Sequence, residues 1–174
     1  ENNQDSIIVS VHHYVLKNTT VASGEWEGVK NPEKKGIYQS YYHGFKERGT
    51  PRGASYLYWV DSIPNAGVFE NYLRNNPGTV DIWIGGHTHT NPDDTFGNKS
   101  HIETRWGVTF INAAALSKYH ASITTLPMSR LLQLRENSNK LKIKCYLHTD
   151  DYAPRGWYNR AERNLELSRK FRLR

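Results

Sequence analysis

The sequence has few of the residues and segments that cross-link or anchor a chain. It contains a single cysteine, Cys145, among 174 residues, which excludes an internal disulfide framework and a cysteine-rich zinc site. Cys145 lies in an alternating apolar and polar segment, so we expect it to pack and not to act as a nucleophile. No apolar run approaches the ~20 residues that cross a bilayer. No signal-peptide pattern opens the chain, and we interpret its start at Glu1, in place of Met, as a processed product or fragment.

Acidic residues are outnumbered by basic ones, and the excess is concentrated at the C-terminus. The formal net charge is +6. Residues 155–174 contain seven basic residues and two acidic ones, Glu162 and Glu166, which gives a net charge of +5. Such a segment can bind nucleic acid or another anionic surface. The alternative is a solvated tail, or one docked on an acidic neighbour within the protein.

Apolar patterning predicts a mixed α/β fold with a sheet as its spine. Short buried strands are expected at 6–11, 80–84 and 107–112, and a helix at 66–75 that ends before Pro77. A hairpin is expected from strands 130–135 and 140–147. Residues 17–55 are polar and follow no helical period, so we interpret them as an insertion or lid.

Histidines follow two of the predicted strands. His12 and His13 come after the first strand, and His87 and His89 follow Gly85-Gly86 after the strand at 80–84. Neutral imidazole is the commonest metal ligand in proteins, and open α/β sheets place their sites at the carboxyl ends of strands. If the two strands are neighbours, about 5 Å apart, these imidazoles can converge on one cation.

The His-x-His pattern alone leaves other families open. It also occurs in cupins, amidohydrolase barrels and metallo-β-lactamases. Metallo-β-lactamases usually continue to an aspartate where this chain has Asn91. A barrel needs about 250 residues, more than this chain offers. Other candidates are weaker: Asp93 and Asp94 could meet a cation or be solvated, and His120 could approach the site.

The combination of strand-His-His, helix, and strand-Gly-Gly-His-x-His resembles the second half of the calcineurin-like metallophosphoesterases. Asn112-Ala113-Ala114 after the third strand, the terminal hairpin and Gly156-Trp157-Tyr158 are also similar to members of that group. The resemblance implies the C-terminal half of a β-sandwich flanked by helices, spanning residues 1–154. Residues 155–174 would form a basic C-terminal tail.

Roles for individual histidines follow from the resemblance. His12 and His87 would bind one metal, and His89 would bind the other. His13 would either line the substrate pocket as a catalytic residue or simply pack. Family members hold two divalent or mixed-valence ions, Mn, Fe or Zn, all of which accept imidazole. Two such ions about 3.5–4 Å apart stabilise both the attacking and the leaving oxygen of a phosphate ester.

The chain departs from the family pattern in its missing first half. It contains no Asp-x-His, no Gly-Asp pair and no Gly-Asn-His, so the bridging aspartate and the catalytic histidine of that half are absent. We therefore expect this chain alone to bind metal weakly and to catalyse nothing. Full function would need an N-terminal half, attached covalently or supplied as another chain.

A second hypothesis needs no metal. The chain would then be a non-catalytic basic module that binds nucleic acid or a protein partner, or a scaffold. It predicts salt-sensitive binding that survives the loss of His87 and His89. The two hypotheses can therefore be told apart by the response to salt and to histidine substitution.

Overall fold

The computed structural model describes residues 5–16, 19–21, 45–46, 50–51, 66–86, 91–95, 98–114, 116 and 127–173. These residues form a mixed α/β fold made mostly of strands. The strands form two four-stranded sheets, and the described residues include one α-helix, which is short. A further two-stranded pair, β2 (Phe45–Lys46) and β3 (Thr50–Pro51), lies within the segment interpreted as an insertion.

The first sheet has the strand order β1-β4-β6-β5. Its members are β1 (Val9–Tyr14), β4 (Ile82–Gly86), β5 (Ile102–Arg105) and β6 (Val108–Asn112). β1 and β6 both pair with β4 in parallel, and β5 returns antiparallel to β6. The expected strands at 6–11, 80–84 and 107–112 are therefore present with shifted ends, whereas β5 was not expected.

The second sheet has the order β10-β8-β7, with β9 also paired to β8. The expected hairpin is formed by β7 (Met128–Leu134) and β8 (Lys140–Leu147). β9 (Gly156–Trp157) and β10 (Arg163–Glu166) come from the basic C-terminal segment, with the 3-10 helix η2 (Asn159–Ala161) between them. Both strands pair antiparallel with β8, so this part of the segment is folded into the sheet.

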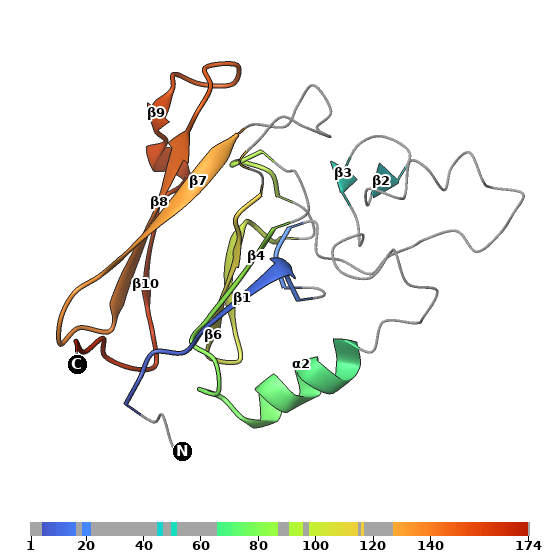
Figure 1. Cartoon of the computed structure of the whole chain (residues 1–174). Helices are drawn as coiled ribbons and strands as arrows, with labels where there is room; N and C mark the ends of the chain where they lie inside the picture. The colour runs from blue at the N-terminus through green and yellow to red at the C-terminus, as the bar shows by residue number, and fades with distance from the viewer. Residues whose placement is uncertain are drawn as a thin grey trace, which may run out of the picture.

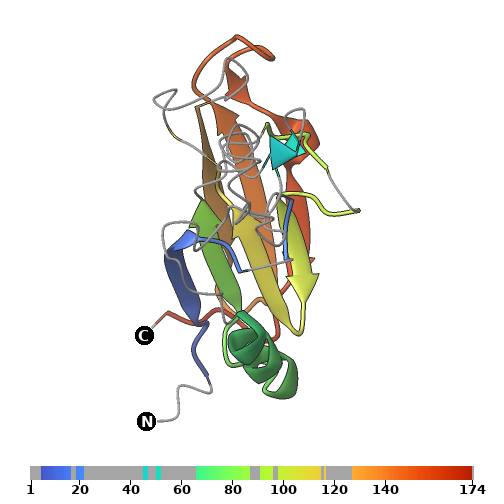
Figure 2. The same cartoon turned by 90° about the vertical axis from the view of Figure 1, so that its right-hand side faces the viewer.

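The layers are a helix, the first sheet and the second sheet (Figure 1). One face of the first sheet packs Trp83 and Phe110 with Leu73 of α2 (Ala66–Asn75). The opposite face packs Ile82 and Ile111 against the second sheet. Figure 2 shows the strands of the first sheet side by side with those of the second sheet behind them. The central strands are apolar on both faces because both faces are covered.

Helix α2 has the bounds expected from the sequence, but its apolar face is only partly covered. Leu73 is buried, whereas Phe69 and Tyr72 remain about half exposed, at 47% and 50%. The helix ends where the backbone amide and the side-chain amide of Asn76 both donate to the Tyr72 carbonyl. Gly78 follows with a φ of +82°, a conformation that favours glycine.

The C-terminal segment is fastened to the start of β4 through Asp81. This carboxylate is fully buried and accepts hydrogen bonds from the Ile8 amide, the Ser168 hydroxyl and Arg169 Nη1. Arg169 also donates to the carbonyls of Ser6 and Gly78. The sequence left three interpretations of the basic segment open: binding an anionic partner, a solvated tail, or docking on an acidic neighbour. The contact with Asp81 fits the last of these for Arg169.

Candidate functional site

The candidate site lies at the edge of the first sheet where β1, β4 and β6 end. The three strands are parallel neighbours, so their carboxyl ends meet at this one edge. Tyr14 is paired with Gly86, and Gly85 is paired with Asn112. These pairs bring three parts of the chain together at the carboxyl edge of the first sheet: residues 12–14, Gly86, and the turn after β6.

His12 and His13 lie inside β1 and not after it, because the strand extends to Tyr14. The sequence prediction had ended this strand at residue 11. Between the paired positions Val11 and Tyr14 the register shifts, so the two histidines occupy an irregularity of the strand. Such bulges redirect side chains and are frequent beside functional sites. Both histidines are exposed.

The His12 ring is held on the helix side of the sheet. It stacks on Trp83 with ring centroids 4.2 Å apart and planes inclined by 21°. Its Nε2 lies 2.6 Å from the Ser10 hydroxyl oxygen. A metal bound through Nε2 would have to displace this hydroxyl, so the arrangement gives His12 a packing role alongside any ligand role.

Gly86 marks a close approach of backbones at the site. A Cβ at this position would come within 3.0 Å of the Ala114 carbonyl oxygen and 3.9 Å of the His13 carbonyl oxygen. Because the nearer oxygen belongs to the backbone, a side chain at Gly86 would force the neighbouring turn to shift, so this close approach favours glycine. The end of β4, the end of β1 and the turn after β6 are thus packed backbone to backbone directly before His87.

The turn after β6 is fixed by Asn112, which is fully buried. Its Oδ1 accepts a hydrogen bond from the Ala114 amide at 2.9 Å, and its Nδ2 donates to the Val21 carbonyl at 3.3 Å. Ala114 has a φ of +58°, and the Ala113 amide donates to the Gly85 carbonyl. The side chain of Asn112 therefore stabilises an otherwise unfavourable left-handed turn at the site.

The candidate residues His87, His89 and His120 lie outside the described residues. The described part of the chain contains no group of three or more His, Cys, Asp or Glu side chains placed to hold a metal ion. The described residues do fix the positions of two strands: β1, which carries His12 and His13, and β4, which ends directly before His87. Imidazole nitrogens are suitable donors for Mn, Fe and Zn.

Asp93, four positions after His89, is bound by protein donors. The hydroxyl of Tyr158 donates to Asp93 Oδ2 at 2.5 Å, that of Tyr152 donates at 3.0 Å, and Arg160 Nη2 lies 3.3 Å away. Burial, followed by the hydrogen bond to Asp93, raises the pKa of Tyr158. The segment after the His-x-His motif is therefore anchored to the loop between β8 and β10. Sequence reasoning missed this anchor because its partners are 65 residues apart.

Asp94 also has a local structural role. Its Oδ2 accepts the backbone amide of Asn91 at 2.8 Å, and the Asp94 amide donates back to the Asn91 carbonyl. Burial raises the pKa of the Asp94 carboxyl. The expected alternatives for Asp93 and Asp94 were a cation ligand or solvated charge, and the geometry adds a third, the fixing of the loop conformation.

A buried histidine and a half-buried arginine lie between the sheets near this end of the sandwich. Burial, together with the charges of Arg130 and Arg163, lowers the pKa of His101 to about 3, so its imidazole is neutral near neutral pH. Arg130 donates through Nη1 to the Ala161 carbonyl at 3.4 Å, while its buried Nε and Nη2 find no hydrogen-bond partner among the described residues. The pKa of the neighbouring Cys145 thiol is raised by burial, which agrees with a packing role.

Comparison with known proteins gives no match to a family model, a curated protein or a solved structure.

Proposed function

We propose that this chain is the C-terminal half of a metal-dependent phosphoesterase of the calcineurin-like type. The observation that carries the proposal is the parallel pairing of β1 with β4. These are the two strands whose carboxyl ends carry histidines, and the pairing brings residues 12–14 beside Gly86. The condition stated from the sequence, that the two strands be sheet neighbours, is met.

The candidate histidines have the right chemistry for a metal site, because imidazole nitrogens bind Mn, Fe and Zn. In this proposal they are one part of a larger ligand set. His12 and His87 would hold one ion and His89 the other, with His13 beside them at the substrate. Two such ions would polarise the phosphoryl oxygens and stabilise the charge that develops on the attacking and leaving groups. The chain's own contribution is to orient imidazoles: Gly86 and the Asn112 turn fix the backbone before His87, and Asp93 fixes it after His89.

The need for a further segment is supported by the uncovered side of β1. Among the described strands β1 lies at the edge of its sheet. Val9 and Val11 are paired with Ile82 and Ile84, yet they are 46% and 70% exposed. An exposed apolar edge strand is a template for pairing with another strand. An N-terminal half, covalently attached or supplied as another chain, would cover these valines and add the missing carboxylate ligands and catalytic histidine.

The substrate of the completed site would be a phosphate ester. This chain alone would bind metal weakly and would not turn over such an ester, because a metal site depends on a complete and oriented ligand set.

The proposal is tested by titrating the 174-residue chain with Mn²⁺ and following the free Mn²⁺ signal by electron paramagnetic resonance. We expect weak binding that drops about tenfold or more when His87 or His89 is replaced by alanine. His12→Ala and His13→Ala variants, compared side by side, show which histidine of β1 contributes. His148→Ala is the matched control, because this histidine is exposed on the second sheet.

Equal Mn²⁺ binding by the wild type and the His87→Ala and His89→Ala variants would refute the metal site. Robust ester hydrolysis by the purified chain would refute the requirement for a missing half. In protein from its native source, elemental analysis with intact mass should find about two metals per complete domain, together with a longer chain or a partner.

A further inference from the structure

The outer side of the second sheet is a polar and aromatic surface that the proposed metal site does not use. Alternating residues of a strand share one face, and the buried residues of β8, Leu141, Ile143, Cys145 and Leu147, point toward the first sheet. The outer face therefore carries the intervening residues. We call this surface the outer face, and its β8 residues are Lys140, Lys142, Lys144 and Tyr146.

Neighbouring strands complete the outer face. Strand register places Gln133 of β7 and Asn164 of β10 on either side of Lys142. Trp157 of β9 is paired with Tyr146. From Lys140 to Tyr146 the surface extends ~20 Å along β8, given a rise of about 3.4 Å per residue. In Figure 1 the second sheet lies on the side of the molecule away from α2.

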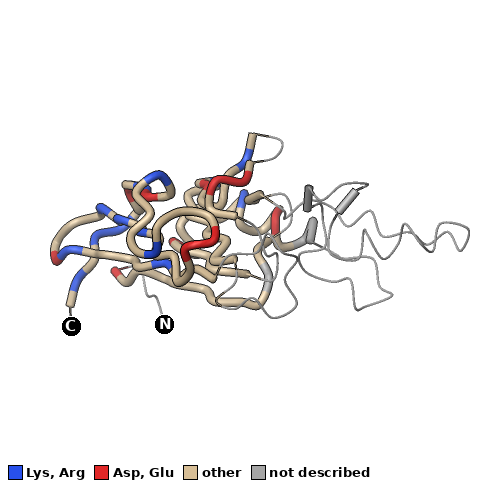
Figure 3. The backbone as a smooth tube through the Cα atoms, turned by 90° about the horizontal axis from the view of Figure 1, so that it is seen from above, with Lys and Arg blue, Asp and Glu red and all other residues tan. Residues whose placement is uncertain are grey.

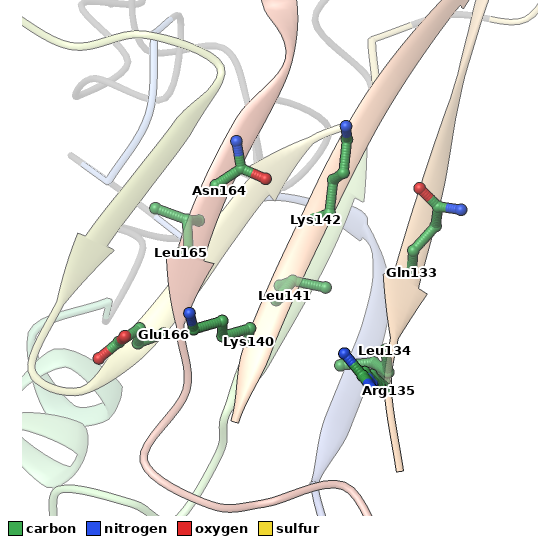
Figure 4. Close-up of a pocket in the computed structure, with 9 residues that line it drawn as sticks. All are labelled: Gln133, Leu134, Arg135, Lys140, Leu141, Lys142, Asn164, Leu165 and Glu166. Atoms are coloured by element: carbon green, nitrogen blue, oxygen red, sulfur yellow. The ribbon is translucent and has the colours of Figure 1, made fainter. Parts of the chain in front are cut away.

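A groove of about 520 Å³ opens at one end of this face. Figure 4 shows its lining side chains, with the amides of Gln133 and Asn164 on either side of the Lys142 amine. Arg135, Lys140 and Glu166 line the same groove. The groove thus offers cationic groups and amides that can both donate and accept hydrogen bonds.

Aromatic side chains occupy the other end of the face. Trp157 is 49% exposed, and its ring contacts the Tyr146 ring edge to face at a centroid distance of 5.2 Å. The Lys144 ammonium lies 4.1 Å from the centre of the Trp157 ring. The Trp157 ring is therefore held in place by two neighbours while half of its surface stays open to a ligand.

The charge of the outer face is positive. Four basic residues, Arg135, Lys140, Lys142 and Lys144, are set against two acidic ones, Glu162 and Glu166, a net of +2. Lys142 is paired with Glu162 at 2.5 Å, whereas no ion pair is recorded for Lys140 or Lys144 within the described chain. Among the described residues, Figure 3 shows many of the Lys and Arg positions on the side of the second sheet.

We propose that the outer face of the second sheet binds single-stranded nucleic acid. Lys140 and Lys144 contact successive phosphates along β8, and the amides of the groove accommodate bases or sugars. Trp157, braced by Tyr146, stacks on a base. Proteins that bind single strands with little sequence preference combine a positively charged track with aromatic platforms in this way.

The aromatic platform favours nucleic acid over other polyanions. A sulfated polysaccharide or an acidic peptide offers charge but no planar rings along its length, so it would make no use of the Trp157 ring. A lipid surface would contact lysines without filling a groove of this size. The distinguishing property is a contribution from Trp157 that does not depend on salt.

The test measures fluorescence anisotropy of a labelled twelve-nucleotide oligo-dT titrated with the full chain at several salt concentrations. The double variant Lys140→Glu, Lys144→Glu should weaken binding at least about tenfold. The slope of the logarithm of the binding constant against the logarithm of the salt concentration should fall in magnitude by ~1.4, because each lost phosphate contact accounts for about 0.7. Trp157→Ala should weaken binding about tenfold without changing the slope, and Trp157→Phe should restore most of the loss.

Matched variants separate this face from general charge and from the metal site. Lys99→Glu with Arg105→Glu changes the net charge equally but lies on the first-sheet half, so it should reduce binding far less than the Lys140 and Lys144 pair. His87→Ala with His89→Ala should leave oligo-dT binding unchanged, which makes this proposal independent of the phosphoesterase proposal. Urea unfolding midpoints of the variants establish that each is folded.

The proposal is overturned if the two charge-reversal pairs weaken binding equally, or if folded Trp157→Ala protein binds oligo-dT as the wild type does. It is likewise overturned if heparin or anionic phospholipid vesicles bind as tightly as oligo-dT and Trp157→Ala leaves their relative affinities unchanged. The absence of oligo-dT binding by the wild type at low salt overturns it outright.

Discussion

The buried imidazole of His101 is a single residue whose environment makes a measurable contribution to stability. Its pKa is lowered by burial and by nearby guanidinium charges to about 3, against an ordinary value of 6.5. The unfolded chain therefore binds a proton more readily than the folded chain. The stabilising effect of the neutral form is complete above pH about 6.5 and is lost as the pH falls toward 3.

We expect His101→Asn to reduce the dependence of stability on pH. In the wild type, His101 lowers the unfolding free energy by up to about 1.4 kcal/mol for each pH unit that the pH decreases below 6.5. Urea unfolding at pH 7 and pH 5 measures the difference for both proteins. His148→Asn, at an exposed position, is the control for removing a histidine. Identical pH dependence in wild type and His101→Asn would contradict the expectation.

Residue-level predictions from sequence succeeded where burial depends on local alternation. Cys145 was expected to pack and is buried. The stacking of His12 on Trp83 could not be foreseen, because it depends on β1 and β4 being neighbours and on the shift of register before Tyr14. For the same reason the anchor from Asp93 to Tyr158 has no signature in the sequence.

At the scale of elements, periodicity located the segments that bury apolar side chains. The helix at 66–75 and the hairpin of β7 and β8 have strong patterns and clear breakers. Two of the missed strands, β5 and β10, are short and polar: Ile-Glu-Thr-Arg and Arg-Asn-Leu-Glu. Each becomes a strand because it pairs with a well-defined neighbour, β6 or β8, and not because of its own propensity.

The ion pair between Arg169 and Asp81 is expected to hold the C-terminal segment against the first sheet. Arg169→Ala leaves the buried Asp81 carboxylate without its cation, and breaking a buried pair in this way costs about 3–5 kcal/mol. We expect a lower urea midpoint with an unchanged slope, or a chain that is already unfolded without urea.

Arg172→Ala is the control for that experiment. This arginine lies in the same segment, is exposed, and should change stability by no more than about 0.5 kcal/mol. If Arg169→Ala and Arg172→Ala have the same midpoint, the Asp81 contact does not anchor the segment.

At the scale of the whole molecule, the distribution of exposed apolar side chains is uneven. Val9 and Val11 continue the inner face formed by Ile82 and Ile84 but are not covered by the second sheet. Phe69 and Tyr72 of α2 are also half exposed. Exposed apolar side chains on an edge strand offer a place where another chain or segment can pack.

We therefore expect the isolated chain to self-associate through the edge of β1. Val11→Lys should reduce this association, because a charged side chain on an edge strand opposes pairing. Its effect on folding should be within about 0.5 kcal/mol, since Val11 is 70% exposed. Sedimentation velocity over a range of concentrations measures the change.

Leu173→Lys is the matched control, because Leu173 is 73% exposed and lies outside the strands. It should leave self-association unchanged. An equal effect of both substitutions would show that added charge, and not the β1 edge, governs the association.

The sequence by itself determined the fold class, the position of the helix and of the strongest strands, and the histidine pattern that suggests a metal site. These features depend on interactions between residues near in sequence, which periodicity and turn residues record. Only the tertiary structure decided that β1 and β4 are parallel neighbours, that β9 and β10 extend the second sheet, and that Lys144 and Trp157 share its outer face. Each of these depends on pairing between strands distant in sequence, and short polar strands carry no local signal of which neighbour they will join.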